Sequence, residues 1–252
     1  MGETIVFTSG KGGVGKTTTI ANIGAGLSQL DKKVVMLDTD MGLRNLDVVM
    51  GLENQINYNL LDLLENRCRL NQALIRDKRF PNLYMIPASL KMIPLDKYQE
   101  SFSVLLNHLK KEFDFCLIDC PAGIDQGFRF AISVADRAII LTTPNISSVK
   151  DASRVLQLIN GSSLNRVEMI INEYDEKLVR KKYMLSKKDI EELFDIPILG
   201  VISHDTKVMI SQNKGIPVVT MRSKATKQFM YLSEQMITNI SLDKEEYIYD
   251  IS

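Results

Sequence analysis

Gly10-Lys11-Gly12-Gly13-Val14-Gly15-Lys16-Thr17 is the stretch of sequence that decides the fold. It fits the phosphate-loop pattern G-x-x-x-x-G-K-[ST]. The apolar run Thr4–Ser9 before it predicts a strand, and the apolar residues after it recur at spacings of three and four, which predicts a helix. Those residues are Ile20, Ile23, Leu27 and Leu30. A glycine-rich turn between a strand and a helix lets backbone N–H groups surround phosphate oxygens, so this context predicts a nucleotide-binding site.

The two lysines of this loop have different expected roles. Lys16 is placed to neutralise charge on the β- and γ-phosphates, and the Thr17 hydroxyl is placed to ligate Mg²⁺. Lys11 stands at the head of its own loop, from where it cannot easily curl back onto its own γ-phosphate. We therefore expect it to reach the nucleotide of a partner across a dimer, with a solvated loop lysine as the alternative. The residues expected to contact nucleotide here are Gly10, Lys11, Gly12, Gly13, Val14, Gly15, Lys16, Thr17 and Thr18.

Short apolar runs alternate with helical patterns along the whole chain. Strands that are apolar on both faces and separated by helices predict a parallel sheet covered on both sides. We expect a doubly wound α/β fold of seven or eight mostly parallel strands, as in P-loop NTPases, forming a single domain over residues 1–240. An acidic tail, residues 241–252, follows it. The predicted strands include Thr4–Ser9, Val34–Leu37, Leu83–Ile86, Phe115–Ile118, Ala138–Leu141, Met169–Ile171 and Ile198–Ile202. Helices are predicted around Asn59–Glu65, Phe102–Leu109 and Val149–Ile159, and over Lys224–Ile240.

The composition excludes several classes of protein. Thirty-one basic residues balance thirty-one acidic ones, so the chain has no global basic field for nucleic acid or an anionic membrane. No apolar run approaches the ~18 residues of a spanning helix, and the N-terminus carries no targeting pattern. Three cysteines are an odd number for a disulfide framework, which predicts reduced thiols and a cytoplasmic protein.

Three carboxylates follow two of the predicted strands. Asp38 and Asp40 come at the end of the second strand, and Asp119 follows Phe115–Ile118. Ligands bind outside the carboxyl ends of the strands in doubly wound sheets, so we expect these acids to converge on the phosphate loop. Asp119 suits the role of holding Mg²⁺ directly or through water. For any one of these acids alone, capping of a helix or turn is the competing interpretation.

The sequence Lys11-Gly-Gly-Val-Gly-Lys-Thr-Thr18 resembles the deviant phosphate loop of the MinD/ParA family of ATPases. The resemblance covers roughly residues 3–235, and its most specific part is Gly42-Leu-Arg-Asn-Leu-Asp47. Further matching stretches are Leu37–Met41, Asn71–Ile75, Asp77–Arg79, Pro87–Ser89 and Asp119–Ile124.

This resemblance implies a switch for division-site placement that hydrolyses ATP to ADP and phosphate. It implies an ATP-dependent homodimer with Mg²⁺, which recruits a division inhibitor similar to MinC and answers to a regulator similar to MinE. Asp38 would support the metal shell and Asp40 would orient the attacking water. The stretches Asp40–Asp47 and Asp119–Gly123 look like the two switches of the family, in which Gly123 brings a backbone N–H to the γ-phosphate.

The base-recognition residues depart from the family pattern. Asn172 matches the family position that contacts adenine, although an asparagine that merely ends a strand is the plainer interpretation. Glu173 stands where family members often have arginine, and Ser203-His204-Asp205 stands where they often have Pro-Glu-Asp. Adenine is therefore the expected base, with details that the sequence leaves open.

Two functions from different classes remain open at this stage. The first is the division-site switch, whose usual basic amphipathic anchor is missing from the acidic tail; the second is a ParA-like positioner that binds nucleic acid non-specifically. The basic run Lys177–Lys188 is either a contact for a membrane or nucleic acid or a solvated face. We expect the first function, without nucleic acid, in the cytoplasm, with a peripheral place on the inner face of the bacterial membrane as an open alternative. An iron–sulfur reductase is disfavoured because Cys120 lies inside a switch stretch.

Overall fold

The computed structural model describes residues 2–92 and 95–249, with the side chains of residue 95 and of 239–249 outside this description. Within these residues the fold is built on one eight-stranded sheet in the order β3-β4-β2-β5-β1-β6-β7-β8. Every pairing is parallel except the one between β3 and β4. The strands are β1 Glu3–Thr8, β2 Val34–Asp38, β3 Ile75–Arg76, β4 Leu83–Ile86, β5 Phe115–Asp119, β6 Arg137–Thr142, β7 Val167–Tyr174 and β8 Ile198–Ser203.

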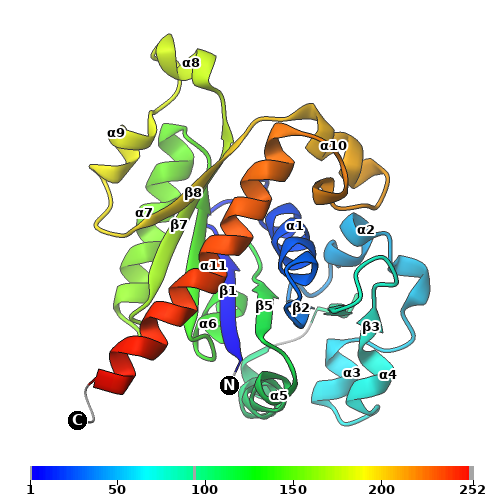
Figure 1. The fold of residues 1–252 in the computed structure, drawn as a ribbon. Coiled ribbons are helices and arrows are strands. Elements are labelled where there is room, and N and C mark those ends of the chain that lie inside the picture. Colours follow the sequence, from blue (N-terminus) through cyan, green and yellow to red (C-terminus); the bar gives the residue numbers. More distant parts are fainter. Residues whose placement is uncertain (1, 93–94, 250–252) are drawn as a thin grey trace.

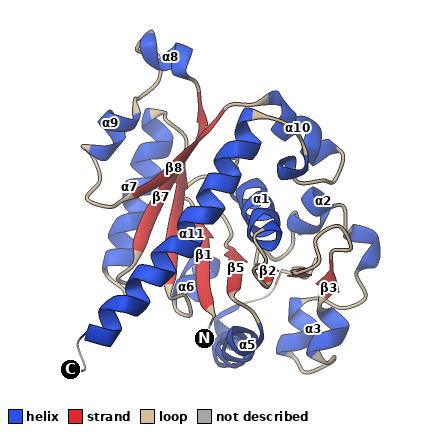
Figure 2. Ribbon diagram, in the orientation of Figure 1, coloured by secondary structure: helices blue, strands red, loops and turns tan. Residues whose placement is uncertain are grey.

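Helices cover both faces of this sheet (Figures 1 and 2). The α-helices are α1 Lys16–Gln29, α2 Leu46–Met50, α3 Leu60–Leu64, α4 Leu70–Ala73, α5 Gln99–Glu112, α6 Gln126–Ile132, α7 Ile146–Asn160, α8 Glu176–Arg180, α9 Lys187–Glu191, α10 Thr206–Asn213 and α11 Lys224–Tyr249. Three short 3-10 turns, η1 Glu53–Gln55, η2 Leu95–Tyr98 and η3 Val218–Thr220, connect them.

Two apolar cores lie on the two faces of the sheet. One contains Val6 of β1 with side chains of α3, α5, α6 and α7, and the other contains Ile5 and Phe7 of β1 with side chains of α1, α2 and α11. Successive residues of a strand point to opposite faces, so a strand that must fill both cores is apolar throughout. The predicted doubly wound fold is therefore confirmed.

The central place of β1 fixes where a ligand can bind. β1 pairs with β5 on one side and β6 on the other, so the phosphate loop that follows it opens at the middle of the carboxyl edge. The chain turns toward β2 after β1 and toward β6 after β5, which makes this edge the topological switch point of the sheet.

The structure adds elements that the apolar pattern did not predict. β3 has two residues and pairs antiparallel with β4, and two residues are too few to show a period. Helix α11 continues to Tyr249, past the predicted boundary at residue 240. Residues 250–252 and the side chains from 239 onward lie outside the described part, so the division into residues 1–240 and an acidic tail 241–252 stays a prediction. Among the described residues, no helix combines the length and the apolar character that crossing a bilayer requires.

Arg79 joins three segments beside the site. Its guanidinium forms an ion pair with the buried Asp77, with Nη2 2.6 Å from Oδ2, and donates from Nη1 to the Gly215 carbonyl at 2.8 Å. It also donates to the carbonyl of Met50, the last residue of α2. At Gly51, which follows α2, a Cβ would lie 2.6 Å from the Gly215 carbonyl oxygen, so the backbones themselves are in contact. These contacts, which we call the Arg79 clamp, fix α2 against the turn after α10.

We expect Arg79→Ala to lower the free energy of unfolding by about 3 kcal/mol, because it leaves the Asp77 carboxylate buried without its counter-ion. Urea denaturation measures this loss. The matched control is Arg67→Ala, since Arg67 pairs with Asp62 and Glu65 at an exposed position and should cost under about 1 kcal/mol. Equal costs for the two variants would show that the clamp contributes no more than a surface ion pair.

Candidate nucleotide-binding site

The phosphate loop has the backbone that its glycines predict. Gly13 and Gly15 have φ angles of 78° and 93°, which side-chain-bearing residues rarely adopt. A Cβ on Gly15 would lie 2.3 Å from the Nδ2 atom of Asn172, and one on Gly10 would lie 2.4 Å from the Asp151 carbonyl oxygen of α7. The loop is therefore packed between β7 and α7, and α1 begins directly after it at Lys16. The N-terminal N–H groups of α1 are the donors that bind anions at helix ends.

Asp38 and Asp119 are register partners across β2 and β5. Their side chains are 0% and 2% exposed. Asp38 accepts backbone hydrogen bonds from Asp40 at 2.9 Å and from Leu46 at 3.2 Å. Burial and then the charge of Asp119 raise the pKa of Asp38 to about 8. The sheet thus holds two acids side by side at the place predicted from the sequence.

Asp119 is also joined to the phosphate loop. Burial raises its pKa to about 6, although the Lys16 ammonium and a hydrogen bond from Thr17 act to lower it. Its Oδ1 atom is buried and has no hydrogen-bond partner within the described residues. A buried carboxylate oxygen without a donor, next to a threonine hydroxyl, fits a hard cation such as Mg²⁺, which prefers oxygen ligands.

No cluster of three or more His, Cys, Asp or Glu side chains in the described part of the chain is arranged to hold a metal by itself. This agrees with the way in which Mg²⁺ binds in nucleotide sites, where substrate phosphates and water supply most of its ligands.

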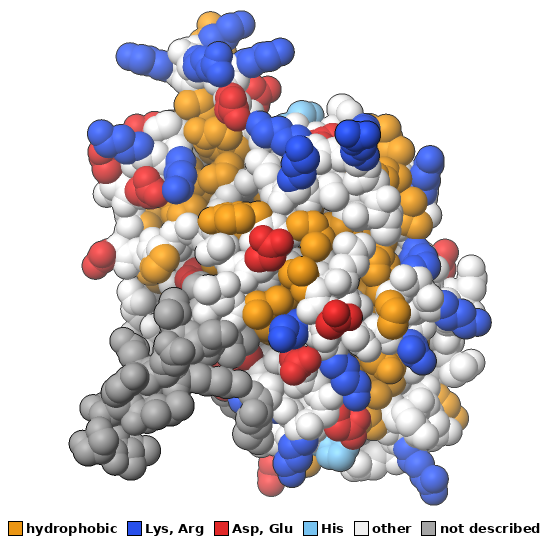
Figure 3. All heavy atoms as spheres, viewed as in Figure 1, with side chains coloured by type: hydrophobic (Ala, Val, Ile, Leu, Met, Phe, Trp, Pro, Cys, Tyr) orange, Lys and Arg blue, Asp and Glu red, His pale blue; other side chains and the backbone are white. Residues whose placement is uncertain are grey.

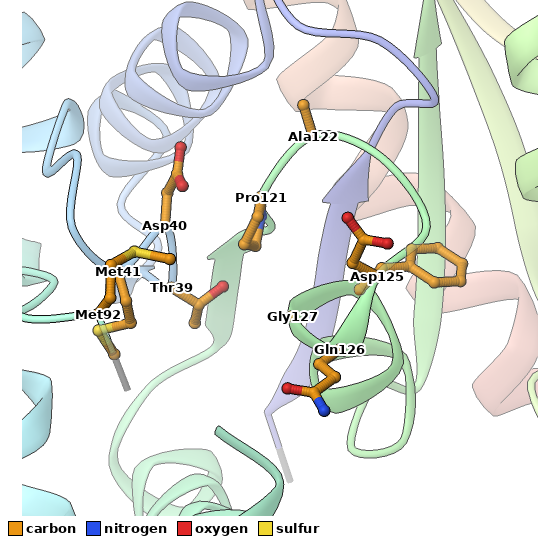
Figure 4. A pocket seen from close by; sticks show the side chains of 10 residues that line it. Thr39, Asp40, Met41, Met92, Pro121, Ala122, Asp125, Gln126 and Gly127 are labelled. Atoms are coloured by element: carbon orange, nitrogen blue, oxygen red, sulfur yellow. The ribbon is translucent and has the colours of Figure 1, made fainter. Parts of the chain in front are cut away.

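Asp40 borders a pocket of about 470 Å³ between the two switch stretches. Figure 4 shows Asp40 with Met41 and Met92 on one side of this pocket, and Asp125 and Gln126 on the other. Asp40 is partly buried; burial raises its pKa, and the charge of Lys16 opposes this rise. The carboxylate thus lies within the electrostatic reach of Lys16 and faces an open volume.

Gly123 takes the left-handed conformation, with a φ angle of 98°. Its N–H donates to the Ser9 carbonyl at 3.0 Å, and the Ser9 hydroxyl donates to the Lys11 carbonyl at 2.8 Å. The Gly123 N–H is therefore engaged with the loop backbone here. Its predicted contact with a γ-phosphate requires this bond to break, and that contact stays a prediction.

Asn172 contacts the phosphate loop in a way that the sequence did not predict. Its Nδ2 donates to the Val14 carbonyl of the phosphate loop at 2.8 Å, so the amide holds the loop, and a contact with adenine stays a prediction. Glu173 follows with a φ angle of 58° and forms an ion pair with His204. The Glu173 carboxylate raises the pKa of His204, so two of the residues that depart from the family pattern contact each other.

Sequence reasoning missed two residues that act on the site. The Thr39 hydroxyl donates to the Asp119 carbonyl at 2.8 Å, and its position between Asp38 and Asp40 was the signal that could have found it. Gln212 of α10 donates to the Thr18 hydroxyl, and nothing in the sequence connects two residues so far apart.

Lys11 is exposed and forms no ion pair within residues 2–92 and 95–249.

Comparison with known proteins agrees with this geometry. A model of the AAA domain family matches residues 2–196. The septum site-determining protein MinD of Synechocystis sp. is 46% identical over 219 residues, which is 87% of this chain and 82% of the relative.

Two solved structures share the fold. MinD of Aquifex aeolicus, in its MinC:MinD complex, superposes with a TM-score of 0.86 at 39% identity, covering 94% of this chain and 96% of the other. MinD of Pyrococcus horikoshii, complexed with Mg-ADP, gives a TM-score of 0.84 at 30% identity, covering 94% and 96%.

The sheet order, the phosphate loop at its switch point and the matched AAA domain define a P-loop ATPase of the MinD/ParA class. At 46% identity over most of its length, the chain belongs to the septum site-determining MinD family. The resemblance that the sequence suggested is confirmed.

We expect Asp119→Asn to stabilise the nucleotide-free protein at pH 8 by up to about 3 kcal/mol and to leave it unchanged near pH 4. The reason is that the pKa of Asp119 rises from 3.8 to about 6 on folding, so the ionised form destabilises the fold above pH 6 and this penalty is lost as the pH falls toward 4. Thermal unfolding in EDTA at both pH values measures it.

The control for this prediction is Asp195→Asn, which alters an exposed carboxylate and should change stability equally little at both pH values. A loss of stability in Asp119→Asn at pH 8 would show that burial of this carboxylate carries no cost.

Proposed function

We propose that this chain is an ATP-driven switch in the placement of the division septum, which hydrolyses ATP to ADP and phosphate as an ATP-dependent homodimer. The observation that carries the proposal is the arrangement at the phosphate loop, where Lys16 acts on Asp119, the register partner of Asp38, and on the half-buried Asp40. The MinD relatives support the same function.

The binding step uses the loop backbone and four side chains. The N–H groups of residues 10–18 would hold the phosphates, and Lys16 would neutralise the charge between the β- and γ-phosphates. Mg²⁺, which the P. horikoshii relative carries with ADP, would be held by Thr17 and Asp119, with Asp38 supporting its shell. When bound, the ion supplies charge neutralisation on the phosphate oxygens.

Asp40 has a separate proposed role in hydrolysis. Its side chain borders an open pocket. We therefore assign it to orienting the attacking water, and most of its contribution comes from positioning. Gly123 would exchange the Ser9 carbonyl for a γ-phosphate oxygen, and the reverse exchange after phosphate release would return the switch to its present conformation.

The dimer step rests on the surface around the site. Leu43 of the first switch stretch, Met92, and Ile124 directly after the second switch stretch are exposed apolar side chains, and Lys11 of the phosphate loop is also exposed. Burial of these side chains against a second copy would stabilise a dimer, and Lys11 would then reach the nucleotide of the partner. Because the A. aeolicus relative was solved in a MinC:MinD complex, we propose a similar division inhibitor as the partner of this dimer, and a MinE-like regulator by resemblance.

A ParA-like positioner on nucleic acid is the weaker alternative. The net charge of zero gives no general attraction to phosphate backbones, and the relatives with 42–46% identity are named MinD. We place the protein in the cytoplasm, with any membrane contact peripheral. Cosedimentation with liposomes and with DNA, in ATP and in ADP, decides between the two functions.

We expect Lys11→Ala to abolish ATP-dependent dimerisation and hydrolysis while ADP affinity is unchanged, because Lys11 acts on the nucleotide of the partner. Light scattering with ATP and titration calorimetry with ADP are the measurements. Lys111→Ala, which removes an exposed lysine on α5, is the matched control. A Lys11→Ala protein that dimerises and hydrolyses ATP at the normal rate would show that Lys11 is only a solvated loop lysine.

We expect Asp40→Ala to slow hydrolysis by ~10²–10⁴, or about 3–5 kcal/mol of barrier, while Mg-ATP still binds. The variant should accumulate as a lasting ATP dimer, since Lys16, Thr17 and Asp119 still hold phosphate and metal. Size exclusion with multi-angle scattering, beside a phosphate-release assay, follows it over an hour. Lys16→Ala, which should not bind ATP, is the reference, and a wild-type rate for Asp40→Ala would remove Asp40 from catalysis.

A further inference from the structure

A groove of about 760 Å³ lies between α7, α8 and α9, outside the nucleotide site. Its apolar lining comes from Ile146, Val179, Tyr183 and Leu185. Ile146 and Tyr183 are 77% and 79% exposed, so two large apolar side chains border the groove with nothing from the described chain covering them. The Leu185 N–H donates to the Pro144 carbonyl at 3.0 Å, which fixes the floor of the groove to the end of β6.

Lys182 borders this groove in a conformation that favours glycine. The N–H of Tyr183 donates to the Leu178 carbonyl and the N–H of Lys182 donates to the Val179 carbonyl, both at 2.9 Å. These bonds form a Schellman motif after α8, in which the residue at the position of Lys182 is usually glycine. Lys182 has a φ angle of 58°, so it carries a side chain at a position where glycine would be less strained. Strain of this kind gathers at functional positions.

The positive charge around the groove is only partly neutralised. Arg180 pairs with Glu176 at 3.6 Å, and Lys187 pairs with Glu191 at 3.1 Å. Asp189, the acid that lines the groove, accepts from the Ser186 N–H at 2.7 Å and so caps α9. Lys181 and Lys182 form no ion pair within the described residues. Figure 3 shows lysine and arginine side chains gathered over α8, with hydrophobic side chains directly below them.

We propose that this groove binds a short segment of another protein that carries an apolar anchor between acidic residues. The apolar floor would receive the anchor, and Lys181 and Lys182 would pair with the flanking acids. A nucleic-acid backbone needs cations along a track and gains nothing from an apolar floor. A bilayer surface fits projecting apolar side chains better than a concave groove. Charge and shape together therefore select an acidic peptide.

The test begins with a phage-displayed library of random peptides, selected on the protein in ADP. The ADP form is used because the proposed function expects a monomer there, so failure of the groove and failure of the switch are distinguishable. We expect enrichment of peptides with Leu or Phe between Asp and Glu. Fluorescence anisotropy then measures the affinity of the most enriched peptide, labelled with fluorescein, for each variant.

Two variants carry the test. Tyr183→Ala should weaken binding at least about tenfold, since exposed tyrosines at grooves are frequent anchors. Lys182→Gly should weaken it about threefold to tenfold and should not lower the melting temperature, because glycine relieves the left-handed strain. A purely structural Lys182 would give the opposite result, with unchanged affinity.

Tyr231→Ala on α11 and Lys111→Ala on α5 are the matched controls, since both side chains are exposed and α5 lies at the far end of the molecule from α8 (Figure 1). Neither should alter affinity. The proposal is overturned if no acidic peptide is enriched, or if Tyr183→Ala and Lys182→Gly bind like wild type. It is equally overturned if these variants instead lose binding to phosphatidylglycerol vesicles or to duplex DNA, measured in parallel, while peptide binding is unaffected.

Discussion

The burial of two neighbouring carboxylates, those of Asp38 and Asp119, is the constraint on which the rest of the site depends. Parallel pairing of β2 with β5 sets them opposite each other, and burial removes the water that would screen them. Several contacts stabilise the ionised carboxylates. The Lys16 ammonium and a hydrogen bond from Thr17 act on Asp119, and two backbone N–H groups donate to Asp38. Within the described residues, one oxygen of Asp119 is still without a hydrogen-bond partner, and Mg²⁺, a hard cation that prefers oxygen ligands, would be held there.

The same two residues also contact the switch stretches, Asp38 through its carboxylate and Asp119 through its backbone carbonyl. Asp38 accepts from the N–H groups of Asp40 and Leu46, at the two ends of the first switch stretch. In the second, the Asp119 carbonyl accepts from the N–H and hydroxyl of Thr39. A change of charge on Asp38 therefore acts directly on the backbone of the first stretch, to which the Asp119 backbone carbonyl is joined through Thr39. The exposed Leu43 of the first stretch and Ile124, which directly follows the second, would carry that change to the surface.

The sequence predicted the parts of the structure that follow from local pattern and from sheet geometry. The doubly wound fold, the loop backbone and the meeting of Asp38 with Asp119 all follow from apolar strands and from where each strand ends. The hold of Asn172 on Val14, the bond from Gln212 to Thr18 and the Arg79 clamp could not be predicted. Each joins residues distant in sequence through one side-chain bond, and such a bond leaves no periodicity. The partner of the Gly123 N–H was also out of reach, because a switch has more than one partner and the sequence does not say which is engaged.

At the ends of β7 and β8, Glu173 and His204 both differ from the residues that the family often has at these positions. The family often has arginine at the position of Glu173 and glutamate at the position of His204, and in this chain the two side chains are in contact. In this chain a carboxylate stands on β7 and a basic group directly after β8, and the two are paired. The basic partner is now a histidine, whose pKa the Glu173 carboxylate raises. The ion pair is therefore complete below that pKa and is lost as the pH rises through it, whereas an arginine would keep it at any physiological pH. Asn172, the neighbour of Glu173, donates to the phosphate loop. The Glu173–His204 pair therefore lies on the side of the site where the base is expected to bind.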